Sequence, residues 1–565
     1  MRQISAHRGS GNVSRRGLLA GTAVVAGAVV APTLLAGCDS AGTGAKGPGT
    51  TGADALKRAL PNYVPSKAVT ADLPGSAGSP GTASDPTFLS YPASPVPTVS
   101  GVPGSGGNYT TRTPLWGAIP PSNGNAYYDA MNKALGATLK MQPTDGNNYV
   151  DTIPALFASG NLPDWIQIPG WANTKLNLGS ALEHFVDLTP HLSGDAVAAY
   201  PILASIPSTA WQSGVWNGKL YGLPCFASAG GFPGYIFHRR DILEAAGVSP
   251  EVRSADDLFN LGKQLTNENR GQWAFDDMWP YLMFPFGVTS PWTTDAGGKL
   301  IHQYETDGIV EAIVFAARLA KAGYVHPDAL ANNTQQGQQR FWSGKVVIQG
   351  GGTGGWDGDD AKGGRAANPR YDRQAFKVFH AHGGTPAIQL STGSGWFSYL
   401  NRKLSDKQVR ECLAVANFLA APYGSKEYLL VNFGADGVDH TMSGGNPILT
   451  DRGQKEVAAS YQFLVSPPAV TLVKNGFAQV AKDYAAWQAD AVKRAVKPLF
   501  YAMNITEPPQ YASIGQQVED TIKDVRYGRK PIDAYKSAVD TWRKQGGDQL
   551  RTFYDDIRSR YGTGQ

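Results

Sequence analysis

The sequence predicts an α/β protein with two lobes, and two observations lead to that prediction. From about residue 109 onward, short apolar segments with strand character alternate with amphipathic segments of helical period. This alternation is typical of parallel sheets covered by helices. About 455 residues follow that point, which is more than one hydrophobic core usually serves. We find no internal repeat, so two separate α/β lobes are the simplest arrangement.

The first elements of the body alternate in type. Gly136 stands where a helix would end, because glycine adopts the left-handed conformation that closes helices. Strands are expected at 114–119, 138–143 and 163–169, and helices at 126–136 and 148–160.

Later helices carry clearer signals. Ser254 is a good N-cap, and Asp257 follows at the spacing of a capping box. Leucines at 258, 261 and 265 then share one helical face. The segments 307–323 and 406–422 show the same pattern, and we interpret their apolar faces as core packing.

The N-terminus carries an export signal. Arg15 and Arg16 directly precede the uncharged, Ala- and Gly-rich segment 18–36. A basic start, an apolar segment and small residues define a signal peptide, and twin arginines indicate the Tat route. A transmembrane helix is the alternative, because about 20 apolar residues can span a bilayer. The Gly-rich composition and the ending "LAGC" favour the signal.

Cys38 ends that signal. The sequence "LAGC" at 35–38 resembles a bacterial lipobox, in which the cysteine is acylated and becomes the first residue of the mature chain. We therefore expect residues 1–37 to be removed and Cys38 to be lipidated. Several acyl chains, each contributing ~0.8 kcal/mol per buried CH2, would anchor the protein to the membrane.

The segment 38–108 is rich in Gly, Pro, Ser and Thr and lacks a sustained hydrophobic period. Such a composition buries too little apolar surface to offset chain entropy, so we predict a flexible tether. For residues 88–100, an extended path against the globular body is the alternative.

The charge balance excludes a nucleic-acid partner. The predicted signal contains four arginines and no acid, so its removal leaves 46 basic against 46 acidic residues. A neutral mature chain lacks the excess of basic residues that binding to nucleic acid requires. The other two cysteines, Cys225 and Cys412, are predicted to be free buried thiols rather than a disulfide, because Cys412 falls on the apolar face of a predicted helix.

Several phrases along the body resemble those of family 1 extracellular solute-binding proteins, the lipoprotein receptors of ABC importers for sugars, in their long, LplA-like branch. They occur in family order over about 450 residues. The phrases are "FASGNLPDWIQI" (157–168), "VWNGKLYGLP" (215–224), "YIFHRRDILEAAGV" (235–248), "FWSGKVVIQGGG" (341–352), "VNFGADGVDHT" (431–441) and "WRKQGGDQLRTFYDD" (542–556).

The resemblance implies a periplasmic-binding-protein-like fold of class II type, with two α/β lobes, a hinge and an interlobe cleft. Crossings between the lobes would lie near 224–228, 391–396 and 439–446. One lobe would then comprise 109–226 and 393–442, and the other 227–392 and 443–565.

The resemblance also implies a function. The chain would be a monomeric, membrane-anchored receptor on the extracellular face of the cell membrane. It would capture a sugar or oligosaccharide and deliver it to the permease subunits, without enzymatic activity or cofactor. A secreted glycoside hydrolase, or a receptor for a peptide or siderophore, remains the alternative.

Sugar recognition favours flat aromatic faces at strand ends, joined by polar partners for hydroxyl groups. Some long family members carry a calcium loop, but 266–277 lacks that loop's pattern, and His380 with His382 has no third ligand, so no metal is expected. The predicted ligand-binding residues are Tyr127, Trp171, Arg239, Trp279, Trp356, Asp357 and Trp396. Trp211, Trp487 and Trp542 are expected in the core.

Overall fold

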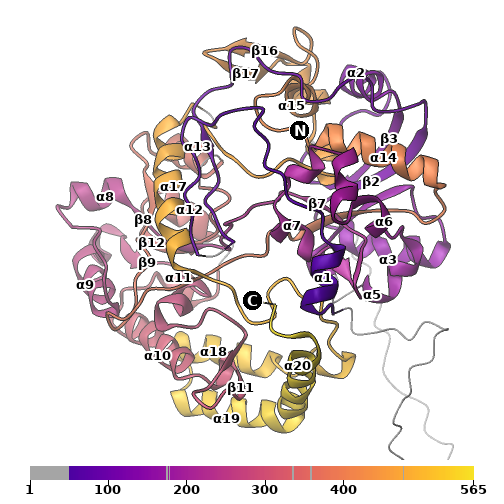
Figure 1. The fold of residues 1–565 in the computed structure, drawn as a ribbon. Helices are drawn as coiled ribbons and strands as arrows, with labels where there is room; N and C mark the ends of the chain where they lie inside the picture. The colour runs from indigo at the N-terminus through magenta and orange to yellow at the C-terminus, as the bar shows by residue number, and fades with distance from the viewer. Residues whose placement is uncertain are drawn as a thin grey trace, which may run out of the picture. The chain divides into compact units, whose positions relative to one another are not determined.

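A computed structural model describes residues 50–564, apart from 80, 173–175, 177, 334–335, 357–358 and 475. The chain divides into two units, Met1–Ala45 and Lys46–Gln565, and the described residues all belong to the second (Figure 1). The predicted signal, Cys38 and the first part of the predicted tether lie outside the described residues.

Lobe 1 is built on a five-stranded sheet with the strand order β3-β2-β4-β15-β7. The first three strands are parallel, and β15, from much later in the chain, runs antiparallel between β4 and β7. The strands are β2 (Asn108–Leu115), β3 (Thr138–Asp145), β4 (Trp165–Pro169), β7 (Leu223–Cys225) and β15 (Trp396–Leu400). All five residues of β4 are buried, as expected of a central strand covered on both faces.

The helices of lobe 1 cover this sheet. They include α2 (Ala126–Leu135), α3 (Tyr149–Ser159), α7 (Ser208–Gln212), α14 (Asp406–Leu419) and α15 (Lys426–Phe433). The predicted end of α2 is confirmed, since Gly136 has φ +61°. The side chain of Asn125 caps the start of that helix by accepting a hydrogen bond from Tyr128 N. Cys225 and Cys412 are free and buried, as predicted.

Lobe 2 has a four-stranded sheet with the order β13-β8-β12-β9. Its strands are β8 (Tyr235–Arg239), β9 (Trp273–Phe275), β12 (Val346–Gly351) and β13 (Arg373–Ala375). Its helices include α8 (Arg240–Ala245), α9 (Ala255–Leu265), α10 (Asp307–Lys321), α12 (Gly337–Trp342), α13 (Asp359–Ala367) and α17 (Ala478–Ala491). The Ser254 cap of α9 is confirmed, and its side chain accepts from Asp257 N.

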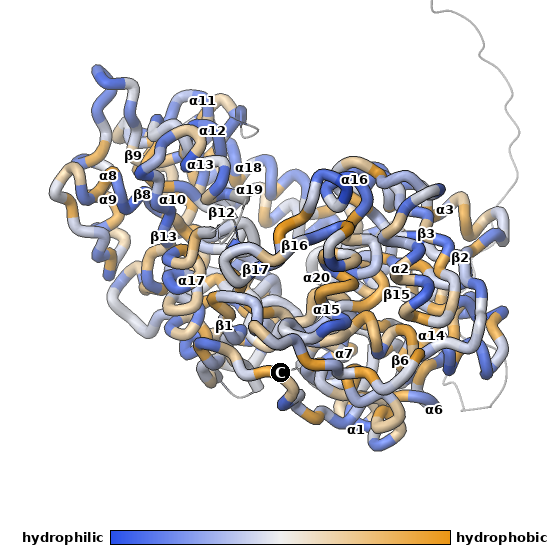
Figure 2. Tube along the Cα trace, turned by 90° about the horizontal axis from the view of Figure 1, so that it is seen from above, coloured by the Kyte–Doolittle hydropathy of each residue, from blue (hydrophilic) through white to orange (hydrophobic). Residues whose placement is uncertain are grey.

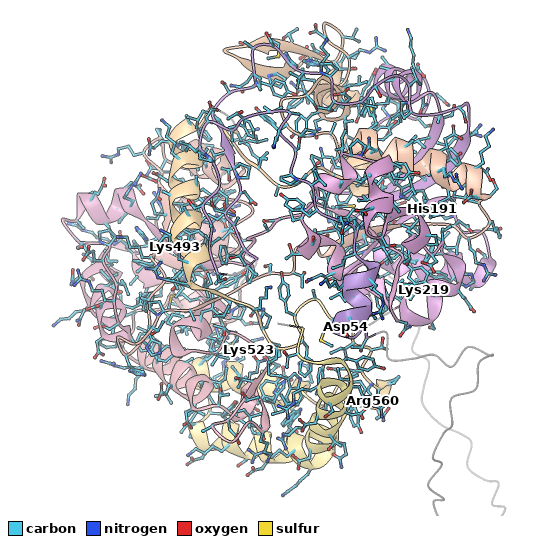
Figure 3. The ribbon with its side chains drawn as sticks, viewed as in Figure 1. Asp54, His191, Lys219, Lys493, Lys523 and Arg560 are labelled. Carbon is cyan, nitrogen blue, oxygen red and sulfur yellow. The ribbon has the colours of Figure 1, made fainter. Side chains whose placement is uncertain are left out.

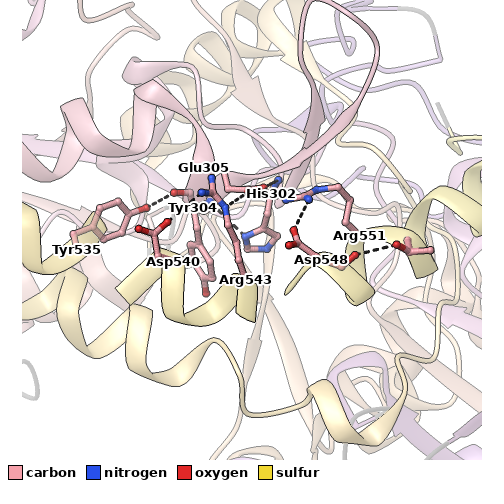
Figure 4. Close-up of polar contacts among 9 residues, drawn as sticks. His302, Tyr304, Glu305, Tyr535, Asp540, Arg543, Asp548 and Arg551 are labelled. Carbon is pink, nitrogen blue, oxygen red and sulfur yellow. Dashed lines mark hydrogen bonds and ion pairs between the residues drawn. The ribbon is translucent and has the colours of Figure 1, made fainter. Parts of the chain in front are cut away.

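Three helices complete the chain beside lobe 2 (Figure 1): α18 (Gln516–Arg526), α19 (Ile532–Trp542) and α20 (Asp548–Tyr561). Glu305 fastens them to the preceding chain (Figure 4), because its carboxylate accepts hydrogen bonds from Arg551 Nη2 at 2.6 Å and Arg543 Nε at 2.7 Å. Burial alone would raise the pKa of Glu305, but these bonds and one from His302 N outweigh it and lower the pKa. A buried carboxylate with two arginines thus ties the end of α19 and the start of α20 to the turn Gln303–Glu305, which precedes α10.

The predicted tether is wrong for residues 50–108, which form a strap packed on the body. The strap includes α1 (Ala53–Ala59) and β1 (Thr87–Phe88), which pairs in parallel with β18 (Thr471–Leu472). Tyr91 is buried, and its hydroxyl donates to Ser425 O. The composition correctly indicates that this segment has no core of its own. The strap is ordered because it buries its apolar side chains on a core made elsewhere.

The hydrophobic cores show where the chain changes lobe. Ala227 belongs to the core of lobe 1 and Phe232 to that of lobe 2, so the first crossing lies between them. Leu390 and Phe397 bracket the second crossing in the same way. The third crossing differs from the prediction of 439–446, because Val465 still packs in the core of lobe 1. Residues 443–465 therefore belong to lobe 1, where η9 (Ala459–Phe463) contacts β2 and β15.

The predicted strand at 114–119 is also displaced, since β2 ends at Leu115. Trp116 and Ile119 are exposed in the loop that follows. These apolar side chains led to the prediction of a strand, but they lie on the surface of the protein. Figure 2 shows how hydropathy varies along the chain, and none of the described helices has the length and hydropathy needed to cross a bilayer.

Glu411 provides a test of how the strap is held. This residue of α14 accepts hydrogen bonds from Ser105 N at 2.6 Å, Gly107 N at 3.0 Å and Tyr109 Oη at 2.7 Å. Burial alone would raise the pKa of Glu411, but these donors outweigh it and lower the pKa. Glu411→Gln should lower the free energy of unfolding at pH 7 by about 1–2 kcal/mol, since bonds to a charged acceptor are stronger.

Urea unfolding at several pH values measures this effect. A depressed carboxyl pKa stabilises the fold above the unfolded value, and that stability is lost as pH falls through the folded pKa. The difference between wild type and Glu411→Gln should therefore close on acidification. The exposed Glu244, changed to Gln, serves as control; a difference independent of pH would contradict this account.

Candidate ligand-binding site

Four aromatic side chains stand at one edge of the lobe 1 sheet. Trp116 follows the end of β2, Trp171 lies two residues beyond β4, and Phe226 follows the end of β7. Trp396 begins β15, and because that strand is antiparallel its start pairs with Pro169 and Cys225 at the same edge. The carboxyl edge of the parallel strands is where open α/β sheets bind ligands.

These rings form one cluster around Trp396, which we call the aromatic patch: Trp116, Trp171, Phe226, Trp396 and Phe463. The ring centroid of Trp396 lies 4.2 Å from that of Trp171 and 5.7 Å from that of Trp116, both at 88°. Phe463 and Phe226 complete the cluster at 5.4 and 6.2 Å from Trp396.

The aromatic patch is partly open to solvent. Trp171 is 53% exposed, Trp116 is 47% exposed and Phe226 is 39% exposed. Exposed aromatic side chains are costly to leave in water, and their concentration in one place indicates a binding surface. Flat rings of this kind can stack against the C–H-rich faces of a ligand, while indole N–H groups can donate hydrogen bonds.

Local backbone geometry presents Phe226 outward. This residue has φ +52°, a conformation uncommon for a residue other than glycine. Its backbone N–H donates to Ser466 Oγ, and Ser394 Oγ donates to the neighbouring Cys225 O at 2.8 Å. The three interlobe crossings thus meet beside the aromatic patch and hold the chain turn that exposes Phe226.

A pocket of about 610 Å³ adjoins the aromatic patch at Trp171 and Gly395. We call it the interlobe pocket, because lobe 2 contributes Trp292 and His302 and the segment 498–505 closes another side. Its volume lies within the range of small-molecule sites. Burial lowers the pKa of His302 to about 3, so its imidazole is neutral at physiological pH. The pocket combines aromatic walls with polar groups, among them the carboxylate of Glu507, which accepts a hydrogen bond from Tyr554 Oη at 2.7 Å.

Lobe 2 presents a different surface at the corresponding end of its sheet. After β12, Gly352, Gly354 and Gly355 are exposed, and Thr353 donates from Oγ1 to Phe232 O at 3.0 Å. No side chain stands within 4 Å of where a Cβ would lie on Gly354 or Gly355. The carbonyl groups of Gly352 and Gly355 already accept hydrogen bonds, from Arg373 Nη2 at 2.9 Å and from Asp360 N at 3.2 Å. The exposed backbone of Gly354 therefore remains as the surface that this loop presents to anything bound next to it.

Two of the predicted site residues, Trp171 and Trp396, lie together in the aromatic patch. Trp279 lies apart from them, half-buried between two cores of lobe 2, with the Arg526 guanidinium 4.5 Å from its ring centroid. Asp357 falls outside the described residues.

Three other predicted ligand-binding residues are instead buried and already bonded. Tyr127 lies in the core of lobe 1 and donates from its hydroxyl to Val431 O at 2.6 Å. Trp356 is 1% exposed and donates from Nε1 to Arg373 O at 2.8 Å. Arg239 is fully buried, with its guanidinium held by Asp241 and by Phe341 O. These side chains stabilise the fold and present no surface to a ligand. Trp211, Trp487 and Trp542 are buried, as predicted.

Sequence reasoning missed Trp116, Phe226, Phe463 and the aromatic walls of the interlobe pocket. The usable signal for Trp116 and Phe226 was their position directly after a strand. It was hidden for Trp116 because the predicted strand ran on to residue 119, and for Phe226 because no strand was predicted at 223–225. Phe463 carried no such signal, because its segment was assigned to the wrong lobe.

Within the described ranges, no three His, Cys, Asp or Glu side chains gather in a way that could hold a metal ion. Asp276, in the loop compared with calcium loops, accepts from Arg340 Nε at 2.6 Å. Asp360 is buried and accepts from Tyr371 Oη at 2.7 Å and Trp342 Nε1 at 2.9 Å. Both carboxylates have structural partners.

Comparison with known proteins defines the class to which this architecture belongs. Residues 126–431 match the family model described as "Bacterial extracellular solute-binding protein", and the chain belongs to that family. The predicted periplasmic-binding-protein-like fold, with two α/β lobes, is confirmed.

Among individual relatives, Lipoprotein LipO of Bacillus subtilis is 22% identical over 482 residues, covering 79% of this chain and 91% of the relative. An HMO-binding, ABC-transporter-associated solute-binding protein from Bifidobacterium longum infantis has a TM-score of 0.57 at 12% identity, covering 81% and 99%. The ABC-transporter substrate-binding protein FusA of S. pneumoniae, in complex with kestose, has a TM-score of 0.53 at 14% identity, covering 80% and 99%.

Two tryptophan substitutions distinguish the binding surface from the core. Trp356→Ala should lower the free energy of unfolding by about 3–5 kcal/mol, because it removes a fully buried indole and its hydrogen bond. Trp171→Ala should cost less than about 1 kcal/mol, because half of that side chain is already in water. Urea unfolding followed by circular dichroism measures both; equal losses would contradict the assignment of Trp171 to an open surface.

Proposed function

We propose that this chain is the substrate-binding lipoprotein of an ABC importer and that it captures a carbohydrate of oligosaccharide size between its lobes. The observation that carries the proposal is the aromatic patch at the carboxyl edge of the lobe 1 sheet, continuous through Trp171 with the interlobe pocket. Aromatic rings beside hydrogen-bonding side chains suit a ligand with apolar C–H faces and many hydroxyl groups.

In this mechanism the ligand first stacks on the exposed rings of lobe 1. The lobes then close by bending at the three crossings, so that the backbone of the Gly352–Gly355 loop and the polar groups of the interlobe pocket complete the hydrogen bonding. Closure is favoured because the ligand has more contacts in the closed state than in the open one. The closed receptor docks on the permease and releases the ligand. No covalent step is involved, so the chain is not an enzyme.

Two relatives support the ligand class. The structure of FusA contains kestose, and the Bifidobacterium protein is described as HMO-binding. Both are similar to this chain in fold, and neither identifies its ligand. The sequence supports export and anchoring, because Arg15 and Arg16, the apolar segment and the lipobox-like "LAGC" occur in the order of a Tat lipoprotein signal.

Binding can be tested with a panel of oligosaccharides by thermal shift and isothermal titration calorimetry. At least one glycan should raise the Tm, since a ligand of the folded state stabilises it. Trp171→Ala and Trp396→Ala should each weaken that glycan's binding by about tenfold or more, because they remove a stacking ring. Val314→Ala, an exposed apolar side chain of α10, is the matched control and should leave affinity unchanged.

The alternatives give different results in the same experiments. Loss of the oligosaccharide with release of reducing ends would identify a glycoside hydrolase. A thermal shift with peptides or siderophores but with no glycan would overturn the ligand class while keeping the receptor role.

Anchoring is tested at Cys38. The wild-type protein should fractionate with membranes and incorporate labelled fatty acid, whereas Cys38→Ser should do neither, because the thioether cannot form. Replacing Arg15 and Arg16 by lysine should retain the precursor inside the cell, as expected for the Tat route. If the Cys38→Ser variant stays with the membrane, the segment 18–36 acts as a transmembrane helix instead.

A further inference from the structure

The strap crosses the body at the point where the interlobe crossings meet. Ala469 N of the third crossing donates to Ala227 O of the first at 2.6 Å. Thr471 N, at the end of the third crossing, donates to Pro86 O of the strap at 2.9 Å, and β1 continues as the partner of β18. The strap therefore adds a further strand to the connection between the lobes, although the chain does not cross from one lobe to the other there.

Asp85 joins three separate parts of this region. Its carboxylate accepts from Ser228 Oγ at 2.8 Å, which lies on the first crossing, and from Gln488 Nε2 at 3.0 Å, which lies on α17 of lobe 2. Its backbone N–H donates to Gln488 Oε1 at 2.9 Å. Gln488 is fully buried, so its amide is bonded on both sides by one strap residue. Removing the strap would leave the buried Gln488 Oε1 without this donor, and Nε2 with only the longer bond to Gly230 O at 3.4 Å, which is costly.

A hollow of about 250 Å³ lies beside these contacts, between the strap and the crossings. Asp85, Ser228 and Ala469 line it together with the phenol side chains of Tyr63 and Tyr423. Such a space allows the strap and the crossings to shift relative to each other without a steric clash, which a close-packed interior would not allow.

We propose that the strap holds the interlobe crossings through the hydrogen bonds of Asp85 to Ser228 and Gln488, and that the lobes move only when these bonds break. We call the strap in this role the clasp, which is closed when the bonds of Asp85 are formed and open when they are broken. The proposal rests on the proposed function in one respect, namely that the lobes move. Asp85 acts here as a positioning residue, since it lies outside the aromatic patch and the interlobe pocket.

The charge state of Asp85 supports the proposal. Both bonds to its carboxylate come from neutral groups, and burial raises the pKa of Asp85 from 3.8 to about 6. Beside Asp85, the hollow is lined by the phenols of Tyr63 and Tyr423, and the Nζ of Lys497 lies 3.7 Å from where a Cβ would be on Gly81. On α17, Asp490 is paired with Arg494 and Asp483 with Arg240. When protonated, the carboxyl can donate to Ser228, so the closed clasp favours the neutral form.

The direction of the pH effect follows from linkage. A carboxyl whose pKa is raised in the closed clasp contributes stability below the pKa of the open form, and loses it as pH rises towards and through about 6. If the open form has the ordinary value of 3.8, opening of the clasp should increase about tenfold between pH 5.0 and pH 7.5.

Two ligand-free measurements on the full chain test this. Hydrogen exchange, corrected for intrinsic rates, should show that backbone amides of 73–88 lose about tenfold in protection from pH 5.0 to pH 7.5. Spin labels at Lys219→Cys in lobe 1 and Lys493→Cys in lobe 2, both exposed (Figure 3), should show a broader distance distribution at the higher pH. Cys225 and Cys412 are buried and should not react with the label, and the labelled protein carries Cys38→Ser.

The variants separate the clasp from general stability. Asp85→Asn keeps the shape and the neutral state, so strap protection and the label distances should no longer depend on pH. Asp85→Ala should give low hydrogen-exchange protection of the strap and a broad distribution of label distances at both pH values. Asp54→Asn, an exposed carboxylate of α1, is the control and should behave like wild type.

The proposed role of the strap is wrong if Asp85→Asn shows the same pH response as wild type, or if Asp85→Ala leaves the interlobe distances unchanged. Because no ligand is used, failure to find a binding glycan would count against the proposed function alone.

Discussion

The structure of lobe 1 depends on one constraint, the insertion of β15 between β4 and β7. This strand comes more than 220 residues after β4 in the chain; it pairs with β4 over its whole length and with β7 from Trp396 to Ser398. Its antiparallel direction places its first residue, Trp396, at the same edge as the ends of β2, β4 and β7. A shift of one residue in this register would turn Trp396 to the other face of the sheet and disperse the aromatic patch. The second interlobe crossing also leads directly into this strand, so the aromatic patch and that crossing share a backbone.

Local patterns predicted the alternating elements, the helix caps, two free thiols and the position of two residues of the aromatic patch near strand ends. These features depend on neighbours within a few residues, which a sequence displays directly. Trp171 and Trp396 could be recognised because each adjoins a strand end. Trp356 follows a strand in the same way and yet is buried, because Tyr484 and Trp487 of α17 cover it from more than 120 residues away. Nothing near Trp356 in the sequence distinguishes the two outcomes.

The N-terminal strap shows a second limit of composition. A segment rich in Gly, Pro and Ser cannot form its own core, and this part of the prediction holds for 50–108. Whether such a segment is free or bound depends on acceptors elsewhere, such as Glu411, Glu427 and Gln488. Glu427 receives the backbone N–H groups of Thr98 and Val99, in the way that a neighbouring strand would. The order of the strap is thus encoded in side chains that lie 300 to 400 residues downstream.

The strap also sets the order in which the molecule can assemble. Its contacts with β18 and Gln488 close loops of nearly 400 residues, whereas the lobe sheets close shorter ones. Contacts of such long range form late, because their loop-closure entropy must be offset by structure that already exists. We therefore expect both lobes to be folded before residues 73–88 settle, and the same segment to detach first when the protein unfolds. An early part of the chain is then the last to become native.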